Sequence, residues 1–241
     1  DSNNYADIEV SERAVLDSTI RVGGVLAYTA SVGSLLENCS NSGNLTLSGN
    51  FTKQASVGGV IGMLGGGSIL TAIKNLSNSG NLTLNGTLAG DARMGGVIAV
   101  TNTAHNVEES EGLFTNTGKI TFASSSSNAN ANIAIGGAIG ASGKNMLADK
   151  CQFVNKGDIV IDSTPIEGQT VNIGGVIGKG DTNIDNIVNE QTGSLTVTTN
   201  DVVNVASSTN LTTVGGIGGG AGCSDDPLWY GYRRHYQHGH Y

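Results

Sequence analysis

The sequence predicts an all-β, single-domain, right-handed parallel β-solenoid (β-helix) of about five to six coils. Two blocks that recur along the chain are the basis of this prediction, together with the lack of any sustained helical period. Both blocks return every 35 to 41 residues. One repeat cannot bury its apolar side alone, so we expect successive repeats to stack and to pair equivalent strands in parallel.

The first block has the form apolar-Gly-Gly-apolar and occurs six times. The copies are VGGVLA from Val22, VGGVIG from Val57, MGGVIA from Met94, IGGAIG from Ile135, IGGVIG from Ile173 and VGGIGG from Val214. Each copy is expected to form a short apolar strand. Its paired glycines permit close packing at a sharp bend.

The second block is an alternating strand that follows a turn. The copies are NSGNLTL from Asn41, NSGNLTL from Asn78, NTGKITF from Asn116, NKGDIVI from Asn155 and EQTGSLTV from Glu190. Leu82 and Leu84 flank Thr83, a period-two pattern that indicates a half-buried strand. The preceding glycine, such as Gly80, marks a turn that needs positive φ or a close backbone approach. A third apolar stretch, such as SLLENC from Ser34, brings each repeat to two or three strands.

The turn before the alternating strand carries an asparagine in four copies. These residues are Asn41, Asn78, Asn116 and Asn155. Stacked amides can hydrogen-bond from coil to coil, so we assign them a structural role. The Gly-Gly repeats place the solenoid in residues 22–220. Residues 1–21 are expected to form an N-terminal strand that leads into it, or a cap, and residues 221–241 an aromatic and His-rich C-terminal cap or contact tail.

Composition excludes several classes of protein. The chain has 20 acidic and 12 basic residues and a formal net charge of −8, which argues against binding nucleic acid. The uncharged segment 54–73 has the length of a membrane span, but it is one copy of the repeat, so we expect no span. The three cysteines, Cys39, Cys151 and Cys223, form no C-x-x-C pair and are expected to be small buried hydrophobes.

These blocks resemble the GLUG-type repeat of bacterial surface adhesins, which has a Gly-Gly-apolar-apolar-Gly block, an Asn/Gly turn and an alternating strand. The matching residues are 58–62 followed by 78–84, and the resemblance covers roughly residues 22–218. It implies an extracellular β-solenoid and adhesion, and it identifies no ligand. The GGAI sequence from Gly136 is also similar to repeats of chlamydial polymorphic outer-membrane proteins. In their F-x-x-N motif Asn follows three residues after Phe, whereas here it follows Phe114 and Phe153 after two.

Titratable residues are sparse, and two groups of them are candidates for chemistry. Glu108, Glu109 and Glu111 lie near His105, but a solvated acidic insertion is the preferred interpretation over catalysis. The run Asp181, Asn183 and Asp185 offers hard oxygens that suit Ca²⁺. An EF-hand loop has Gly and Glu where this chain has Asn186 and Thr192. A polar turn is therefore preferred, and no cofactor is expected, with Ca²⁺ as the one candidate.

The C-terminal segment PLWYGYRRHYQHGHY, from Pro227, differs from the rest of the chain. We consider three roles for it: a cap on the open end of the solenoid, a subunit or carbohydrate contact, and a metal site at His235, His238 and His240. A cap or a subunit contact is preferred, with Trp229 and Tyr230 buried. The candidate contact residues are Trp229, Tyr230, Tyr232 and Tyr236.

Together these features predict a non-enzymatic extracellular surface module, a rigid rod for adhesion or for assembly into a surface structure or fibre. The expected partner is a glycan or protein of a host surface, or other copies of the chain joined end to end. The alternative is a carbohydrate-binding or polysaccharide-degrading β-helix protein. Acids and aromatic side chains from separate repeats that converge on one groove would favour that alternative.

Overall fold

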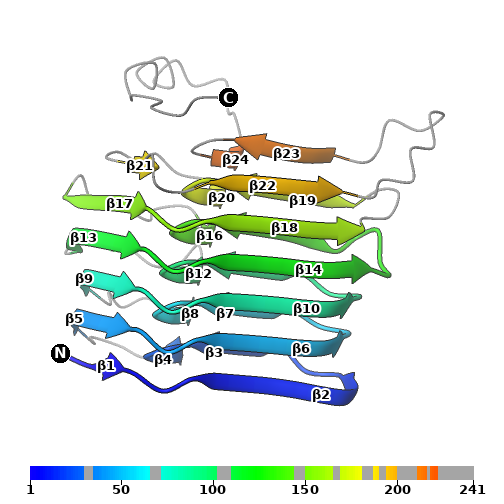
Figure 1. The fold of residues 1–241 in the computed structure, drawn as a ribbon, viewed down its shortest axis with the longest axis horizontal. Helices are drawn as coiled ribbons and strands as arrows, with labels where there is room; N and C mark the ends of the chain where they lie inside the picture. The colour runs from blue at the N-terminus through cyan, green and yellow to red at the C-terminus, as the bar shows by residue number, and fades with distance from the viewer. Residues whose placement is uncertain are drawn as a thin grey trace.

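The computed structural model confirms an all-β parallel β-solenoid. It describes residues 1–29, 35–65, 72–101, 110–143, 150–164, 169–180, 187–189, 194–199, 211–215 and 218–221. Their strands form four parallel sheets of six strands each (Figure 1). We call each set of four consecutive strands, one from each sheet, a layer. The right-handed sense of the coil stays a prediction.

Each sheet takes every fourth strand of the chain. The first sheet contains β1 (Asn3–Asn4), β5 (Leu35–Asn41), β9 (Ala72–Asn78), β13 (Glu111–Asn116), β17 (Cys151–Asn155) and β21 (Ile187–Asn189). The second contains β2 (Ile8–Leu16), β6 (Leu45–Phe51), β10 (Leu82–Leu88), β14 (Ile120–Ser126), β18 (Ile159–Thr164) and β22 (Leu195–Thr199). The third contains β3 (Ile20–Gly23), β7 (Ala55–Gly58), β11 (Ala92–Gly95), β15 (Asn132–Gly136), β19 (Thr170–Gly174) and β23 (Leu211–Gly215). The fourth contains β4 (Leu26–Thr29), β8 (Ile61–Leu64), β12 (Ile98–Thr101), β16 (Ile139–Ser142), β20 (Ile177–Gly180) and β24 (Gly218–Ala221).

Each layer has four strands, more than the two or three expected, because the Gly-Gly block forms two strands joined by a bend. In the second layer β7 ends at Gly58 and β8 begins at Ile61. A Cβ atom on Gly59 would lie 2.0 Å from the carbonyl oxygen of Gly96 and 2.4 Å from Cγ of Asn78. Both distances are too short for a real Cβ contact, so the bend excludes a side chain at this position.

The glycine before the alternating strand is needed for close approach and not for positive φ. A Cβ on Gly80 would lie 1.9 Å from the carbonyl oxygen of Gly43 in the preceding layer. The positive-φ glycines of the described residues are Gly49, Gly86 and Gly112, which lie within strands. The turn is therefore tight because successive layers touch there.

The first strand of each layer ends, at the corner with the second strand, in an asparagine, which is buried in the second to fifth layers. Its Nδ2 donates to Oδ1 of the asparagine in the next layer. The pairs are Asn4 to Asn41 at 2.7 Å, Asn41 to Asn78 at 2.8 Å, Asn78 to Asn116 at 2.8 Å and Asn116 to Asn155 at 2.9 Å. Each Nδ2 also donates to the carbonyl two residues on, as Asn78 does to Gly80 at 2.8 Å. We call this column the Asn ladder.

The Asn ladder touches the Gly-Gly bends and divides the interior into two apolar cores. Asn78 lies against Gly59, and Asn41, Asn116 and Asn155 make the same contact with Gly24, Gly96 and Gly137. The core between the second and third sheets contains residues such as Leu45, Leu47 and Val57. The core between the first and fourth sheets contains residues such as Ile61 and Leu76, and in it Phe114 and Phe153 stack with ring centroids 4.7 Å apart.

Residues 1–21 form β1, β2 and the start of β3, and so extend three of the sheets by one strand. The register pairs Asn4 with Asn41 and Ile8 with Leu45. The segment NYADIEV from Asn4 is therefore a divergent copy of the second block, with Ala6 where later copies have glycine. Sequence analysis missed this copy because it lacks the glycine.

Replacing one member of the Asn ladder is expected to destabilise the whole solenoid. Asn116→Ala removes one hydrogen bond from Nδ2 of Asn78 and one from Oδ1 of Asn155, both in a buried site. We expect the free energy of unfolding, measured by urea denaturation, to fall by about 2–4 kcal/mol. The control Thr83→Ala faces outward and is expected to change it by less than about 0.5 kcal/mol. Equal effects of the two substitutions would contradict a special role for the ladder.

Candidate functional site

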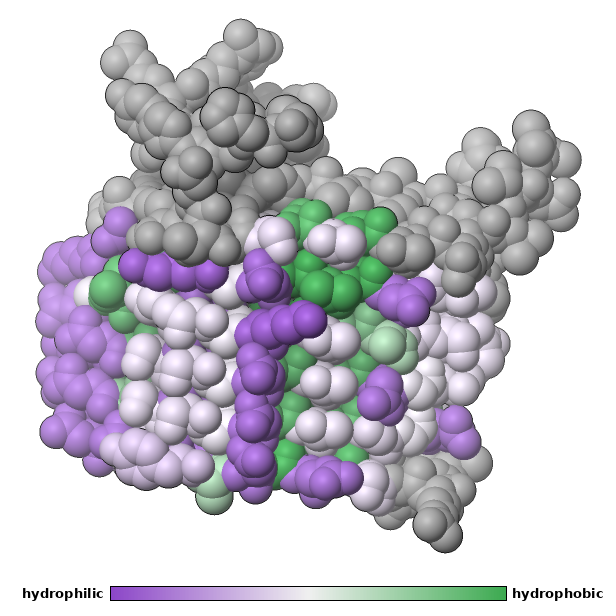
Figure 2. Space-filling model, viewed as in Figure 1, coloured by the Kyte–Doolittle hydropathy of each residue, from purple (hydrophilic) through white to green (hydrophobic). Residues whose placement is uncertain are grey.

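The outer side of the second sheet carries a polar column at the start of its strands. The members are exposed residues, namely Asp7, Asn44, Asn81, Lys119, Asp158 and Ser194. A hydrophilic stripe runs continuously from layer to layer down the face shown in Figure 2. Side-chain oxygens of the column accept backbone N–H groups of the next layer. The N–H of Asn44 donates to Oδ1 of Asp7 at 2.7 Å, and that of Asn81 to Oδ1 of Asn44 at 3.0 Å.

A second column on the same face presents hydroxyl groups. Its members are in register and include Thr46, Thr83, Thr121 and Thr196, with Glu9 and Val160 in the remaining layers. Thr46, Thr83 and Thr121 are half-buried, while the leucines on either side of Thr83 point into the core. Neighbouring strands place these hydroxyls about 4.8 Å apart. The two columns together form a repeating array of hydrogen-bond donors and acceptors, which we call the outer polar face.

Charge on the outer polar face has both signs. The Ser194 hydroxyl donates to Oδ1 of Asp158 at 2.6 Å, and the Ser194 N–H donates to the same oxygen at 2.9 Å. These hydrogen bonds, with a smaller contribution from the Lys119 charge, lower the pKa of Asp158. Asp158 is therefore an anion at neutral pH, beside the Lys119 cation of the layer before.

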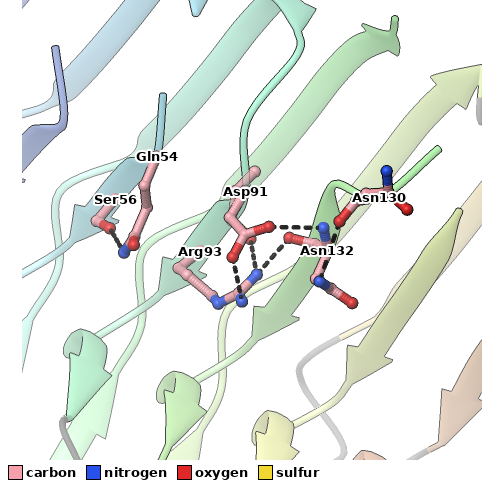
Figure 3. Close-up of polar contacts among 7 residues, drawn as sticks. Gln54, Ser56, Asp91, Arg93, Asn130 and Asn132 are labelled. Carbon is pink, nitrogen blue, oxygen red and sulfur yellow. Dashed lines mark hydrogen bonds and ion pairs between the residues drawn. The ribbon is translucent and has the colours of Figure 1, made fainter. Parts of the chain in front are cut away.

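The third sheet carries a half-buried charged pair that sequence analysis did not single out. Figure 3 shows the side chain of Arg93, from β11, reaching Asp91 and the backbone of Asn132. Its Nη2 lies 2.9 Å from Oδ2 of Asp91, and its Nη1 donates to the carbonyl oxygen of Asn132. The N–H of Asn132 donates to Oδ1 of Asp91 at 2.8 Å, which closes the network.

This network braces two layers and leaves no free charge for a ligand. Burial lowers the pKa of the Arg93 guanidinium, while the charge and hydrogen bond of Asp91 oppose that shift. Two opposite charges two residues apart are the sequence signal for this pair. Residues with that spacing lie on the same side of a strand and can therefore contact each other. The isolated pattern D-x-R has no repeat to draw attention to it.

Glu111 is the one candidate acid that lies within the described residues. It belongs to β13, and its Oε1 lies 2.6 Å from Nζ of Lys74 in β9. The hydrogen bond and the charge of Lys74 lower the pKa of Glu111. A carboxylate that is held ionised is a poor general acid at neutral pH. The other members of that group, His105, Glu108 and Glu109, lie outside the described residues.

The other predicted sites cannot be compared with the structure. The Ca²⁺ candidates Asp181, Asn183 and Asp185 lie outside the described residues, as do the contact candidates Trp229, Tyr230, Tyr232 and Tyr236. In the part of the chain that the structure describes, no group of three or more His, Cys, Asp or Glu side chains is placed to hold a metal ion. The same part contains no helix long and apolar enough to cross a membrane.

Two cysteines are buried free thiols, as expected from the sequence. Cys39 and Cys151 belong to the core between the first and fourth sheets. Burial, with a smaller effect of the Glu111 charge, raises the pKa of the Cys151 thiol to about 11. This thiol is therefore protonated and poorly nucleophilic at neutral pH. Cys223 lies outside the described residues.

Comparison with known proteins leaves the function to be argued from the structure itself. No protein-family model matches the chain, and neither a curated protein nor a solved structure matches it. The fold defines the class as a parallel β-solenoid repeat protein. A fold of this kind does not by itself specify a function.

Thiol labelling tests the burial of the two cysteines. In a Cys223→Ser variant at pH 8, we expect neither Cys39 nor Cys151 to react with a thiol reagent in the native protein. Both are expected to react in concentrated urea, which exposes both thiols and returns the pKa of Cys151 to the ordinary value of about 8.5. Mass spectrometry counts the labelled sites. Rapid labelling of Cys151 in the folded protein would contradict the raised pKa.

Proposed function

We propose that this chain is a non-enzymatic extracellular surface module, a rigid rod used for adhesion or for assembly into a surface structure or fibre. The proposal rests on the outer polar face, where equivalent side chains repeat in register from layer to layer. Its ligand is a glycan or a protein of a host surface, or another copy of the chain. The resemblance of the repeats to those of surface adhesins supports the extracellular location.

Rigidity makes this face suitable for binding. The Asn ladder joins the layers inside, and the polar column of Asn44 and Asn81 joins them outside. Side chains held in this way lose little conformational freedom when a ligand binds. A ligand with regularly spaced hydroxyl or amide groups can then bond to several layers at once, and each contact adds to the others.

The alternative is a carbohydrate-binding or polysaccharide-degrading β-helix protein, and the hydroxyl column is also compatible with sugar binding. Cleavage needs a protonated acid and a second carboxylate on the two sides of one glycosidic bond. Among the described residues, the charge of Lys74 favours the ionised form of Glu111, and Asp91 is paired with Arg93. These pairs favour binding without cleavage.

A glycan array tests the outer polar face directly. Thr83→Lys places a long cation in the middle of this face, and we expect it to weaken glycan binding about tenfold or more. Ser77→Lys is the matched control, because Ser77 is an exposed residue of the same layer on the first sheet. Equal binding by the two variants would place the ligand elsewhere.

An assay for depolymerisation separates the proposal from its alternative. We expect the wild-type chain to release no reducing or unsaturated ends from polysaccharides that it binds. Cleavage that is lost in Glu111→Gln but kept in Ser77→Lys would overturn the proposal and identify an enzyme.

A further inference from the structure

The core between the second and third sheets contains two buried serines that lie in neighbouring layers. Ser124 belongs to β14 and Ser163 to β18, which are adjacent strands (Figure 1) and pair the two residues in register. Their exposed fractions are 6 % and 2 %. Each serine follows a core residue, Phe122 or Ile161, by two positions. Alternate residues of a strand share one side, so both serine side chains point into the core.

Neither serine hydroxyl has a hydrogen-bond partner in the part of the chain that the structure describes. The two are too far apart to bond to one another, because neighbouring strands hold equivalent atoms about 4.8 Å apart, whereas a bond between hydroxyls needs about 2.5–3.0 Å. A buried hydroxyl that stays without a partner destabilises the fold, because the unfolded chain bonds it to water. Two such hydroxyls side by side therefore indicate a bridging group.

A third unpartnered polar atom lies at the same corner between the two sheets. Gln169 comes directly before β19 and is 1 % exposed, and its Oε1 has no partner among the described residues. Its Nε2 donates to Oγ of Ser126 at 2.5 Å. Ser126 is the last residue of β14, two positions after Ser124. This hydrogen bond therefore holds the amide of Gln169 at the end of the core where the serines lie.

The same corner is apolar in the preceding layer. The register places Gly86 beside Ser124, and the fully buried Leu88 beside Ser126. Gly86 has no side chain, so it leaves space next to the Ser124 hydroxyl. An apolar cavity stays dry, whereas a cavity lined by polar groups that lack partners holds water. The change from leucine to serine therefore makes this corner suitable for water in the fourth and fifth layers.

We propose that one buried water molecule bridges the hydroxyls of Ser124 and Ser163. A water about 2.8 Å from two oxygens that are about 4.8 Å apart makes an angle of about 118° between them, close to tetrahedral. It accepts from one hydroxyl and donates to the other, and its second hydrogen bonds to Oε1 of Gln169. About three hydrogen bonds are typical of a buried water.

Water suits this site better than a metal ion does. The three groups carry no charge, and two of them are hydroxyls, which donate as well as accept. A hard cation such as Ca²⁺ selects six or more oxygens, several of them carboxylates. The site lies inside the core, so it is independent of any ligand of the outer polar face.

Ser142 of β16 provides a matched control. It is 5 % exposed, and its hydroxyl also has no partner among the described residues. Its neighbours in register are Thr101 and Gly180. The Thr101 hydroxyl already accepts the N–H of Gly143 at 3.2 Å, and Gly180 has no side chain. No second unpartnered hydroxyl lies beside Ser142, so we expect its site to stay dry.

Alanine substitutions distinguish a bridged pair from two dry hydroxyls. Ser124→Ala and Ser163→Ala each remove one partner of the water, so we expect each to lower the urea midpoint of the full chain. The double variant removes both partners and the water leaves, so its midpoint is expected to fall no further than that of the less stable single variant. Ser142→Ala removes a hydroxyl without a partner and is expected to keep or raise the midpoint. Single variants that raise the midpoint, or a fall of the same size in Ser142→Ala, would overturn the inference.

A crystal structure of the full chain that resolves ordered water locates the molecule directly. We expect a peak of electron density within hydrogen-bond distance of both serine oxygens in the wild type, and no such peak in Ser124→Ala/Ser163→Ala. A wild-type structure with no peak at this place, or with the two hydroxyls bonded to one another, would refute the bridge.

Discussion

One contact recurs in the inner layers of this solenoid, where a buried asparagine lies against the second glycine of a Gly-Gly bend. Asn78 reaches the next asparagine and the carbonyl of Gly80 from this position, and Gly59 admits it because it has no Cβ. The two recurring blocks of the sequence are therefore the two halves of one contact. Since it repeats at the same place, it sets the register of all four sheets.

This contact explains why the interior consists of two cores. The corner and the bend meet in the middle of each layer, so apolar side chains collect on either side of them. The amides between the cores are satisfied by one another, and burial therefore costs them little. A slip of one residue in a strand of the first sheet would turn its apolar residues outward and remove its asparagine from the ladder. Apolar burial and polar pairing thus select the same register.

The outside of the solenoid is free of this constraint, and its residues vary. The exposed column contains Asn44, Asn81, Lys119 and Asp158 in successive layers, while the buried column behind it remains asparagine. Two ion pairs link charges of neighbouring residues or layers, Lys74 with Glu111 and Arg93 with Asp91. The outer columns can therefore change in charge from layer to layer without disturbing the buried ladder.

Local patterns in the sequence were sufficient to predict the parallel solenoid. The repeats, the alternation of Leu82, Thr83 and Leu84, and the burial of Cys39 follow from residues close together in the chain, because period and polarity are local properties. The division into two cores, the split of the Gly-Gly block into two strands and the place of Asn4 in the ladder were decided by the tertiary structure. So was the pairing of Arg93 with Asp91 and Asn132. Each of these features depends on which residues of different layers meet. The loops between the strands vary in length, so this register cannot be worked out from the order of the residues along the chain.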